Sequence, residues 1–309
     1  MLDTPNRKSW PAPARSTASD DPAEILGFAA DACEDGGAAI ATLVDIRGGA
    51  ARALGSHVAV AADGRFCGYV SGGCVEAAVA SEALLALEAG RDRMVMFGEG
   101  SPFFDIVLPC GGGVTVAIHV LRDAAPIRHV LSCLRQRQPA GLTYSPGAGR
   151  LVANDPVVRA GWQGDAFATV YRPATRLVVS GQSNEADMVC GIAEAAGFDV
   201  VNLRPGEDVQ RLSGLIDPFT AVALLHHDID KELDVLDAAL RAEPLYIGAL
   251  GSARTHRRRL DRLAARGWDK DALSRIKAPI GMFGPARDAS SLALSVVADV
   301  AASRLQTYA

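Results

Sequence analysis

Short apolar segments alternate with segments of helical periodicity throughout the C-terminal part of the chain, and this alternation constrains the fold more than any other feature. The predicted strands are 177–180, 200–203, 221–225 and 245–250, and the predicted helices lie at about 181–196, 209–215, 233–241, 255–266 and 288–302. Alternation at these lengths requires a parallel sheet with right-handed crossovers. We therefore predict a Rossmann-like, doubly wound α/β domain over residues 173–309.

The N-terminal part of the chain mixes helices and strands without that alternation, which favours an α+β domain over residues 20–172. A helix is predicted to begin at Asp21-Pro22, where an acidic N-cap precedes a proline in the first turn. Asp63-Gly64 is typical of a hairpin turn between two short strands. Residues 1–19 contain prolines among polar residues and are predicted to be a disordered leader.

Composition and charge exclude several classes of protein. Apolar residues make up 49% of the 309 residues and charged residues 22%, which is a globular composition with material for two cores. The net charge of −5 argues against a nucleic-acid or anionic-membrane binder, since these carry a basic excess. No apolar run reaches the roughly 18–20 residues of a membrane span, and the N-terminus lacks the apolar segment of a signal peptide. We therefore expect a cytoplasmic protein whose six cysteines are thiols.

Two cysteines lie in glycine turns of the first domain. Ser71-Gly72-Gly73-Cys74-Val75-Glu76 connects a predicted strand to a predicted helix, so Cys74 lies at the helix N-terminus, where the helix dipole favours a thiolate. Cys110 begins the second turn, Cys110-Gly111-Gly112-Gly113. Thiolates are soft ligands suited to sulfur-bearing metal centres, and they can also carry sulfur. The pair indicates a functional site, although either cysteine could equally be a small core residue.

Two further loops could hold an anion. Arg52, in a glycine-containing loop after a strand, could clamp an anionic group, or it could be an ordinary surface arginine. In the second domain, Tyr246-Ile247-Gly248-Ala249-Leu250-Gly251-Ser252 joins a strand to a helix that Ser252 can cap. The free N–H groups of that helix could bind a phosphate, whereas the arginines that follow could equally form a solvated basic face.

The loop where a Rossmann domain usually holds a dinucleotide lacks the required glycines. It reads Gly181-Gln182-Ser183-Asn184-Glu185, so one glycine remains, and a glutamate in the first helical turn would repel a phosphate. The acidic residue that would hold a ribose after the second strand is also absent. Both features argue against NAD(P) binding. His226-His227-Asp228 follows the third strand, at the sheet edge where ligands of open sheets bind, and one of the histidines could line a site.

The chain resembles the XdhC/CoxI family, which is named for accessory factors of xanthine dehydrogenase and of aerobic carbon monoxide dehydrogenase. The resemblance covers roughly residues 22–305 and is carried mainly by the Ser71-to-Glu76 and Tyr246-to-Ser252 strings. Further matching positions are Arg52, Gly55, Asp63-Gly64, Cys110-Gly111-Gly112, His227-Asp228, Pro279-Ile280-Gly281 and Ala286-Arg287. The chain departs from the family pattern at Gly181-Gln182-Ser183, where members commonly keep Gly-x-Gly, and at Phe283, where they commonly have an acidic or polar residue.

The resemblance implies an α+β domain followed by a Rossmann-like domain, in a protein that is often dimeric. Family members are thought to bind molybdenum cofactor, protect it during sulfuration and insert it into a molybdenum hydroxylase. The cofactor-binding residues that we predict are Arg52, Gly72, Gly73, Cys74, Glu76, Cys110, Gly111, Gly112, Gly248, Gly251 and Ser252. Of these, Cys74 and Cys110 could contact molybdenum or carry sulfur.

We expect a cofactor chaperone rather than an enzyme, with molybdenum cofactor bound transiently. The expected partners are a molybdenum hydroxylase client, a cysteine desulfurase and a second copy of the chain, with no nucleic acid and no membrane. Two alternatives stay open: an NAD(P)-dependent oxidoreductase that uses the Rossmann-like domain, and a docking scaffold that binds no cofactor.

Overall fold

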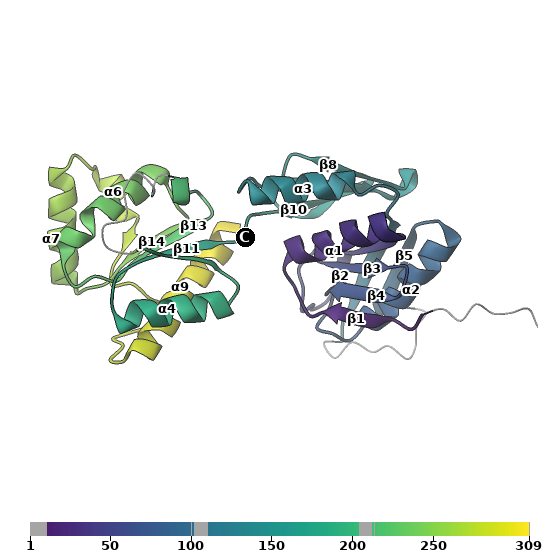
Figure 1. Ribbon diagram of the computed structural model, residues 1–309, viewed down its shortest axis with the longest axis horizontal. Helices are drawn as coiled ribbons and strands as arrows, with labels where there is room; N and C mark the ends of the chain where they lie inside the picture. The colour runs from purple at the N-terminus through teal and green to yellow at the C-terminus, as the bar shows by residue number, and fades with distance from the viewer. Residues whose placement is uncertain (1–10, 100, 102–110, 204–211, 213, 309) are drawn as a thin grey trace, which may run out of the picture. The chain divides into compact units, whose positions relative to one another are not determined.

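The computed structural model describes residues 11–99, 101, 111–203, 212 and 214–308 (Figure 1). The chain forms two compact units, which divide between Arg172 and Pro173. Cys110, one of the two cysteines predicted to contact molybdenum, lies outside the described residues, as does most of the helix predicted over 209–215.

A six-stranded sheet forms the centre of the first unit. Its strands are β1 (Ala14–Thr17), β2 (Ala38–Arg47), β3 (His57–Ala61), β4 (Arg65–Gly68), β5 (Arg93–Gly98) and β6 (Gly113–Val120). The strand order is β1-β4-β3-β2-β6-β5, and every neighbouring pair except β1 and β4 is antiparallel. The predicted hairpin is confirmed, because β3 and β4 pair around Asp63-Gly64.

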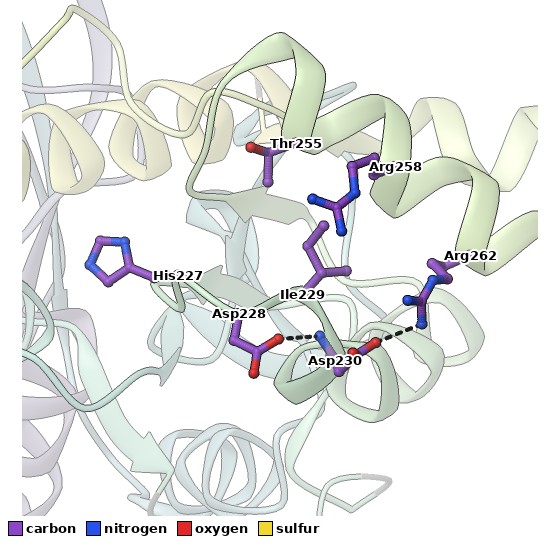
Figure 2. A pocket seen from close by; sticks show the side chains of 7 residues that line it. All are labelled: His227, Asp228, Ile229, Asp230, Thr255, Arg258 and Arg262. Atoms are coloured by element: carbon purple, nitrogen blue, oxygen red, sulfur yellow. Dashed lines mark hydrogen bonds and ion pairs between the residues drawn. The ribbon is translucent and has the colours of Figure 1, made fainter.

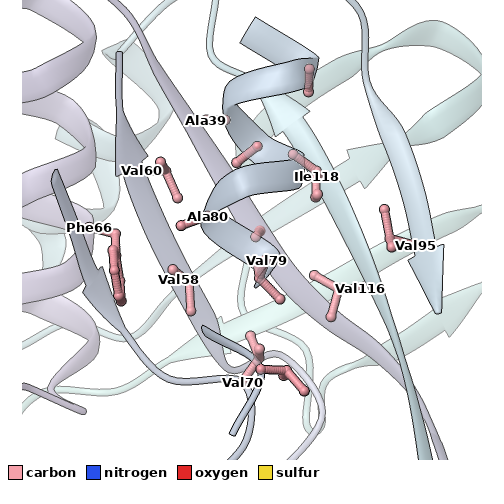
Figure 3. Close-up of a cluster of buried hydrophobic side chains, with 14 of the residues drawn as sticks. Ala39, Val58, Val60, Phe66, Val70, Val79, Ala80, Val95, Val116 and Ile118 are labelled. Atoms are coloured by element: carbon pink, nitrogen blue, oxygen red, sulfur yellow. The ribbon is translucent and has the colours of Figure 1, made fainter. Parts of the chain in front are cut away.

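One helix packs on each face of this sheet. Helix α2 (Glu76–Ala89) covers one face, where its Val79 and Ala80 lie over β2, β3 and β6 (Figure 3). Helix α1 (Pro22–Asp35) covers the other face and begins at the predicted cap, where the Asp21 carboxylate accepts a hydrogen bond from the Ala23 N–H at 2.9 Å. Successive side chains of β2 point to opposite faces, so its alternate residues are buried against different helices.

Strand β1 lies within the segment predicted to be a disordered leader, and the structure corrects that prediction for residues 14–17. β1 pairs in parallel with β4, whose outer edge would otherwise be unpaired. The Arg15 guanidinium also stacks over the rings of Phe66 and Tyr69, at 4.8 and 4.3 Å from their centroids. This polar strand is ordered by backbone pairing and by a stacked arginine, and composition reveals neither contact.

A second, antiparallel sheet completes the first unit. Its strands are β7 (Ala140–Ser145), β8 (Arg150–Asn154), β9 (Gly161–Gln163) and β10 (Ala166–Tyr171), in the order β8-β7-β10-β9, with a 3₁₀ turn η1 (Pro146–Ala148) before β8. Helix α3 (Ala125–Arg135) packs beside α1 and against β7 and β8. Two polar contacts link the two sheets: Tyr171 Oη lies 2.6 Å from His57 Nε2, and the Tyr144 hydroxyl donates to Asp92 at 2.9 Å.

The second unit contains a five-stranded parallel sheet, which confirms the predicted Rossmann-like fold. Its strands are β11 (Arg176–Ser180), β12 (Asp199–Leu203), β13 (Thr220–Leu224), β14 (Tyr246–Ala249) and β15 (Ile276–Lys277). They lie in the order β12-β11-β13-β14-β15. The connections change direction between β11 and β13, and ligands of open sheets bind near such a switch point, beyond the carboxyl ends of the strands.

Helices cover both faces of the parallel sheet. Helices α4 (Asn184–Ala195) and α9 (Ala289–Tyr308) share one buried cluster, and α6 (Leu233–Ala242), α7 (Ala253–Ala265) and α8 (Lys270–Ser274) share the other. A short 3₁₀ turn, η2 (Ile229–Lys231), leads from β13 toward α6. Among the helices that the structure describes, none has both the length and the apolar character needed to cross a membrane.

Candidate functional site

Three loops that carry predicted site residues lie at one end of the six-stranded sheet. β2, β4 and β5 end there, and β3 and β6 begin there, because these neighbouring strands run antiparallel. Three segments therefore meet at this end of the sheet: the loops 48–56 and 69–75, and the residues 111–112. Helix α2 begins at the same end of the sheet. Its N-cap, Val75, follows the four residues 71–74, which we call the Cys74 turn.

Glycines allow these loops to approach one another closely. A methyl group on Gly72 would lie 3.6 Å from the Cβ of Ala51, so the Cys74 turn contacts the loop that carries Arg52. A methyl group on Gly112 would overlap the carbonyl oxygen of Arg47, at the start of that same loop. The predicted residues Arg52, Gly72 and Gly112 therefore belong to one cluster of loops.

The Glu76 side chain, predicted to bind cofactor, holds the Cys74 turn in shape. Its carboxylate is fully buried (0% exposed) and accepts hydrogen bonds from the N–H groups of Val70 at 3.1 Å and Ser71 at 2.8 Å. The Ser71 hydroxyl donates to this carboxylate at 2.9 Å and accepts bonds from the N–H groups of Gly73 and Cys74, both at 3.2 Å. Glu76 is therefore a positioning residue, which shapes the turn from inside.

Cys74 is exposed on this turn, together with Gly72 and Gly73. The other described cysteines are buried or half-buried, and burial raises the pKa of the Cys67 and Cys190 thiols above the usual value. Gly73 has a φ of +110°, and no described atom would lie within 4 Å of a methyl group there. The Cys74 side chain therefore stands beside bare backbone, where a guest molecule can approach it.

Arg52 lies beside the Cys74 turn. Its Nε donates to the Ser71 carbonyl at 3.4 Å, and its guanidinium lies 5.1 Å from the centroid of the Tyr69 ring. A terminal nitrogen of Arg52 also pairs with Asp20 at 2.9 Å, and these side chains are 31% and 68% exposed. Because exposed ion pairs of this kind are weak, an anionic guest can compete with Asp20 for the guanidinium.

Sequence reasoning missed three residues of this site. Arg15 belongs to the segment predicted as a leader, yet its guanidinium, like that of Arg52, lies over the Tyr69 ring. The ring of Tyr69 carries no pattern that would have identified it. Ser71 had a usable signal, because a serine placed shortly before a helix that begins with glutamate can exchange hydrogen bonds with it, much as in a capping box.

The glycines that follow Cys110 are described, although Cys110 itself is not. Gly111 has a φ of +67°, and Gly112 packs against the end of β2. The position of the Cys110 sulfur relative to Cys74 stays a prediction. Within the described ranges, no group of three or more His, Cys, Asp and Glu side chains is arranged to hold a metal ion.

The predicted phosphate turn of the second unit serves packing at one glycine and capping at its end. Gly248 is buried in β14, and a methyl group there would collide with the Tyr246 hydroxyl. The structure therefore gives Gly248 a packing role, and its predicted contact with the cofactor stays a prediction. Gly251 has a φ of +125°, and Ser252 caps α7 as predicted, accepting a hydrogen bond from the Thr255 N–H at 3.3 Å.

Packing also explains the single glycine left in the first loop of the Rossmann-like unit. A methyl group on Gly181 would lie 3.0 Å from both the Cβ and the carbonyl oxygen of Leu225, the residue after β13. The Ser180 hydroxyl lies 2.9 Å from His226 Nε2, and burial lowers the pKa of this histidine. Protein groups thus lie close together between the carboxyl ends of β11 and β13, where a Rossmann domain usually holds a dinucleotide.

The order of the two units and their cysteine and glycine turns correspond to one family of accessory proteins. Residues 33–98 match the model of the XdhC and CoxI family, and residues 177–300 match the model of the XdhC Rossmann domain. The chain therefore belongs to the XdhC and CoxI family, as the resemblance implied.

Two curated relatives come from Escherichia coli K12. The molybdenum cofactor insertion chaperone PaoD is 50% identical over 299 residues, which cover 96% of this chain and 93% of that protein. The uncharacterized protein YqeB is 24% identical over 268 residues, which cover 85% of this chain but 42% of YqeB. A solved structure from Bacillus halodurans, described as a xanthine dehydrogenase, has a TM-score of 0.72 at 20% identity and covers 93% of this chain and 96% of that chain. This last likeness supports the fold alone.

Proposed function

We propose that the chain is a chaperone that binds molybdenum cofactor at the Cys74 turn, assists its sulfuration and inserts it into a molybdenum hydroxylase. The observation that carries the proposal is the exposed Cys74, on a turn held by the buried Glu76 and flanked by Arg52. The relative PaoD, which matches nearly the whole chain, is named a molybdenum cofactor insertion chaperone, and this supports the proposal.

The Cys74 turn suits a cargo that combines a sulfur-ligated metal with a phosphate. A cysteine sulfur is a soft ligand, suited to molybdenum that is already bound by sulfur. Arg52 can exchange its exposed carboxylate partner, Asp20, for the phosphate. Because the turn is open to solvent, a cargo bound there can be handed on without unfolding the site, which suits transient binding.

A carrier of this kind needs a source of sulfur and an acceptor. The acceptor is a molybdenum hydroxylase of the xanthine or carbon monoxide dehydrogenase type, and a cysteine desulfurase supplies the sulfur. The chain works in the cytoplasm as a homodimer, with no nucleic-acid or membrane partner. It uses no NAD(P) and turns over no substrate of its own.

Retention of the cofactor by purified variants tests the proposal. Protein is mixed with molybdenum cofactor and passed over a size-exclusion column, and the molybdenum in the protein peak is measured by elemental mass spectrometry. Cys74→Ser and Cys110→Ser should each lose most of the retained molybdenum. Cys133→Ser is the matched control, since Cys133 is half-buried on α3, and it should retain the wild-type amount.

Equal retention by wild type and Cys74→Ser would contradict the proposal. A pull-down of the hydroxylase that survives the loss of both cysteines, with no cofactor bound, would favour the docking scaffold instead. Saturable binding of NADH or NADPH at micromolar concentration, followed by fluorescence, would favour the oxidoreductase.

A further inference from the structure

The second unit contains a pocket between the segment after β13 and helix α7. Its volume is about 270 Å³ (Figure 2). One wall is formed by residues 227–230, which follow β13, and the other by Thr255, Arg258 and Arg262 of α7. The function proposed above uses none of these residues.

The pocket lies where open parallel sheets bind their ligands. Residues 227–230 leave the carboxyl end of β13, one of the two strands at the switch point, and α7 begins just beyond the carboxyl end of β14. Loops at this edge, and the N-termini of the helices that follow them, are the ligand-binding elements of such folds. At the neighbouring loop after β11, protein groups lie where a ligand would otherwise bind: Leu225 packs against Gly181, and His226 contacts the Ser180 hydroxyl.

Two of the charged side chains that line the pocket pair with each other, and one charged side chain on each wall forms no salt bridge. Arg262 pairs with Asp230 at 2.7 Å. Among the described residues, neither Arg258 nor Asp228 forms a salt bridge; the Asp228 carboxylate accepts one hydrogen bond, from the Asp230 N–H at 3.1 Å. In Figure 2, the Arg258 guanidinium points from α7 toward Ile229, and the Asp228 carboxylate points toward the Asp230 N–H; both residues line the pocket.

A buried ion pair next to the pocket fixes these walls. Arg259 follows Arg258 on α7 and is fully buried; its Nε pairs with Glu232, just before α6, at 2.7 Å. Arg259 also donates to the Leu250 carbonyl at 2.7 Å, which ties α7 to the end of β14. The unpaired Arg258 and Asp228 are therefore mounted on segments whose positions are already set, as a binding site requires.

The two unpaired charges specify the chemistry of a ligand. Arg258, with Thr255 near the N-terminus of α7, suits a phosphate. Asp228 suits a pair of vicinal hydroxyls, because a carboxylate accepts hydrogen bonds on both oxygens and acidic residues hold ribose in this way in related folds. The volume of about 270 Å³ lies just below the range of small-molecule pockets, which begins at roughly 300 Å³, and this favours a single ribose phosphate over a dinucleotide.

We infer that this pocket binds the ribose phosphate of a ribonucleotide, with Arg258 on the phosphate and Asp228 on the ribose hydroxyls. The inference goes beyond the chaperone function and does not depend on the Cys74 turn.

Isothermal titration of the full chain with AMP, GMP, CMP and UMP in turn tests this inference. At least one of the four should bind saturably and more tightly than ribose 5-phosphate, and its 2′,3′-dideoxy form should bind about tenfold more weakly. Equal binding of ribose 5-phosphate and all four nucleotides would assign the pocket to a sugar phosphate and overturn its assignment to a ribonucleotide. Absence of saturable binding at millimolar concentration, or equal binding of inorganic phosphate, would overturn the inference entirely.

Matched variants locate the binding. Arg258→Gln should raise the dissociation constant about tenfold or more, whereas Arg257→Gln, which changes the adjacent exposed arginine outside the pocket, should leave it unchanged. Asp228→Asn can still cap η2 and should bring the ribonucleotide and its dideoxy form to similar affinities. Equal effects of Arg258→Gln and Arg257→Gln would mean general charge attraction and would overturn the site.

Discussion

Replacing Glu76 with alanine should destabilise the first unit and disorder the Cys74 turn. The carboxylate accepts hydrogen bonds from the Val70 and Ser71 N–H groups and from the Ser71 hydroxyl. Its removal leaves two buried N–H groups without partners, at about 1–3 kcal/mol each. Relief from burying a charge offsets part of this cost. We therefore expect the free energy of unfolding of this unit to fall by about 2–4 kcal/mol.

Urea unfolding followed by amide hydrogen exchange measures this change in each unit separately, since two units need not unfold together. Residues 70–76 should exchange faster in Glu76→Ala than in wild type. Glu88→Ala removes an exposed carboxylate from the same helix and should change stability by less than about 0.5 kcal/mol. A loss below about 1 kcal/mol in Glu76→Ala, with unchanged exchange at the turn, would refute the reasoning that Glu76 holds it.

Three further predictions follow from buried or paired charges. Burial lowers the pKa of His57 to about 4, so below about pH 6.5 the unfolded chain binds a proton that the folded chain does not. The free energy of unfolding of the first unit should therefore fall by about 3 kcal/mol as the pH falls from 6.5 to 4. Urea unfolding of His57→Gln should lack this loss. Glu232→Gln leaves the fully buried Arg259 without its counter-ion and should destabilise the second unit by about 3–5 kcal/mol in the same assay; unchanged stability would contradict this account of the pair. Arg52→Gln should weaken cofactor retention about tenfold with unfolding unchanged, because its ion pair is exposed, and wild-type retention would remove Arg52 from the site.

The fold class of the second unit could be predicted because its signals are local. Each strand is a short apolar run, and the helices α4 and α7 begin at serine caps, Ser183 and Ser252, that can be read directly from the sequence. The order of the five strands could not be predicted, since it depends on which distant segments pair. The second sheet of the first unit was missed as a separate sheet for the same reason.

The candidate site could be predicted only in part. The exposure of Cys74 agrees with its glycine turn, which is a local feature. The role of Glu76 depends on its carboxylate folding back toward Val70, and the role of Gly248 depends on the Tyr246 hydroxyl that packs against it. Such contacts are set by tertiary packing, so a glutamate or glycine in a matching motif does not by itself reveal whether it contacts a ligand.

The rate at which iodoacetamide alkylates Cys74, measured by peptide mass spectrometry with and without molybdenum cofactor, tests the central claim most directly. Saturating cofactor should protect Cys74 while the half-buried Cys133 in the same digest reacts at its original rate. Cys74 alkylation at the same rate in both samples would contradict the claim that this sulfur contacts the cofactor.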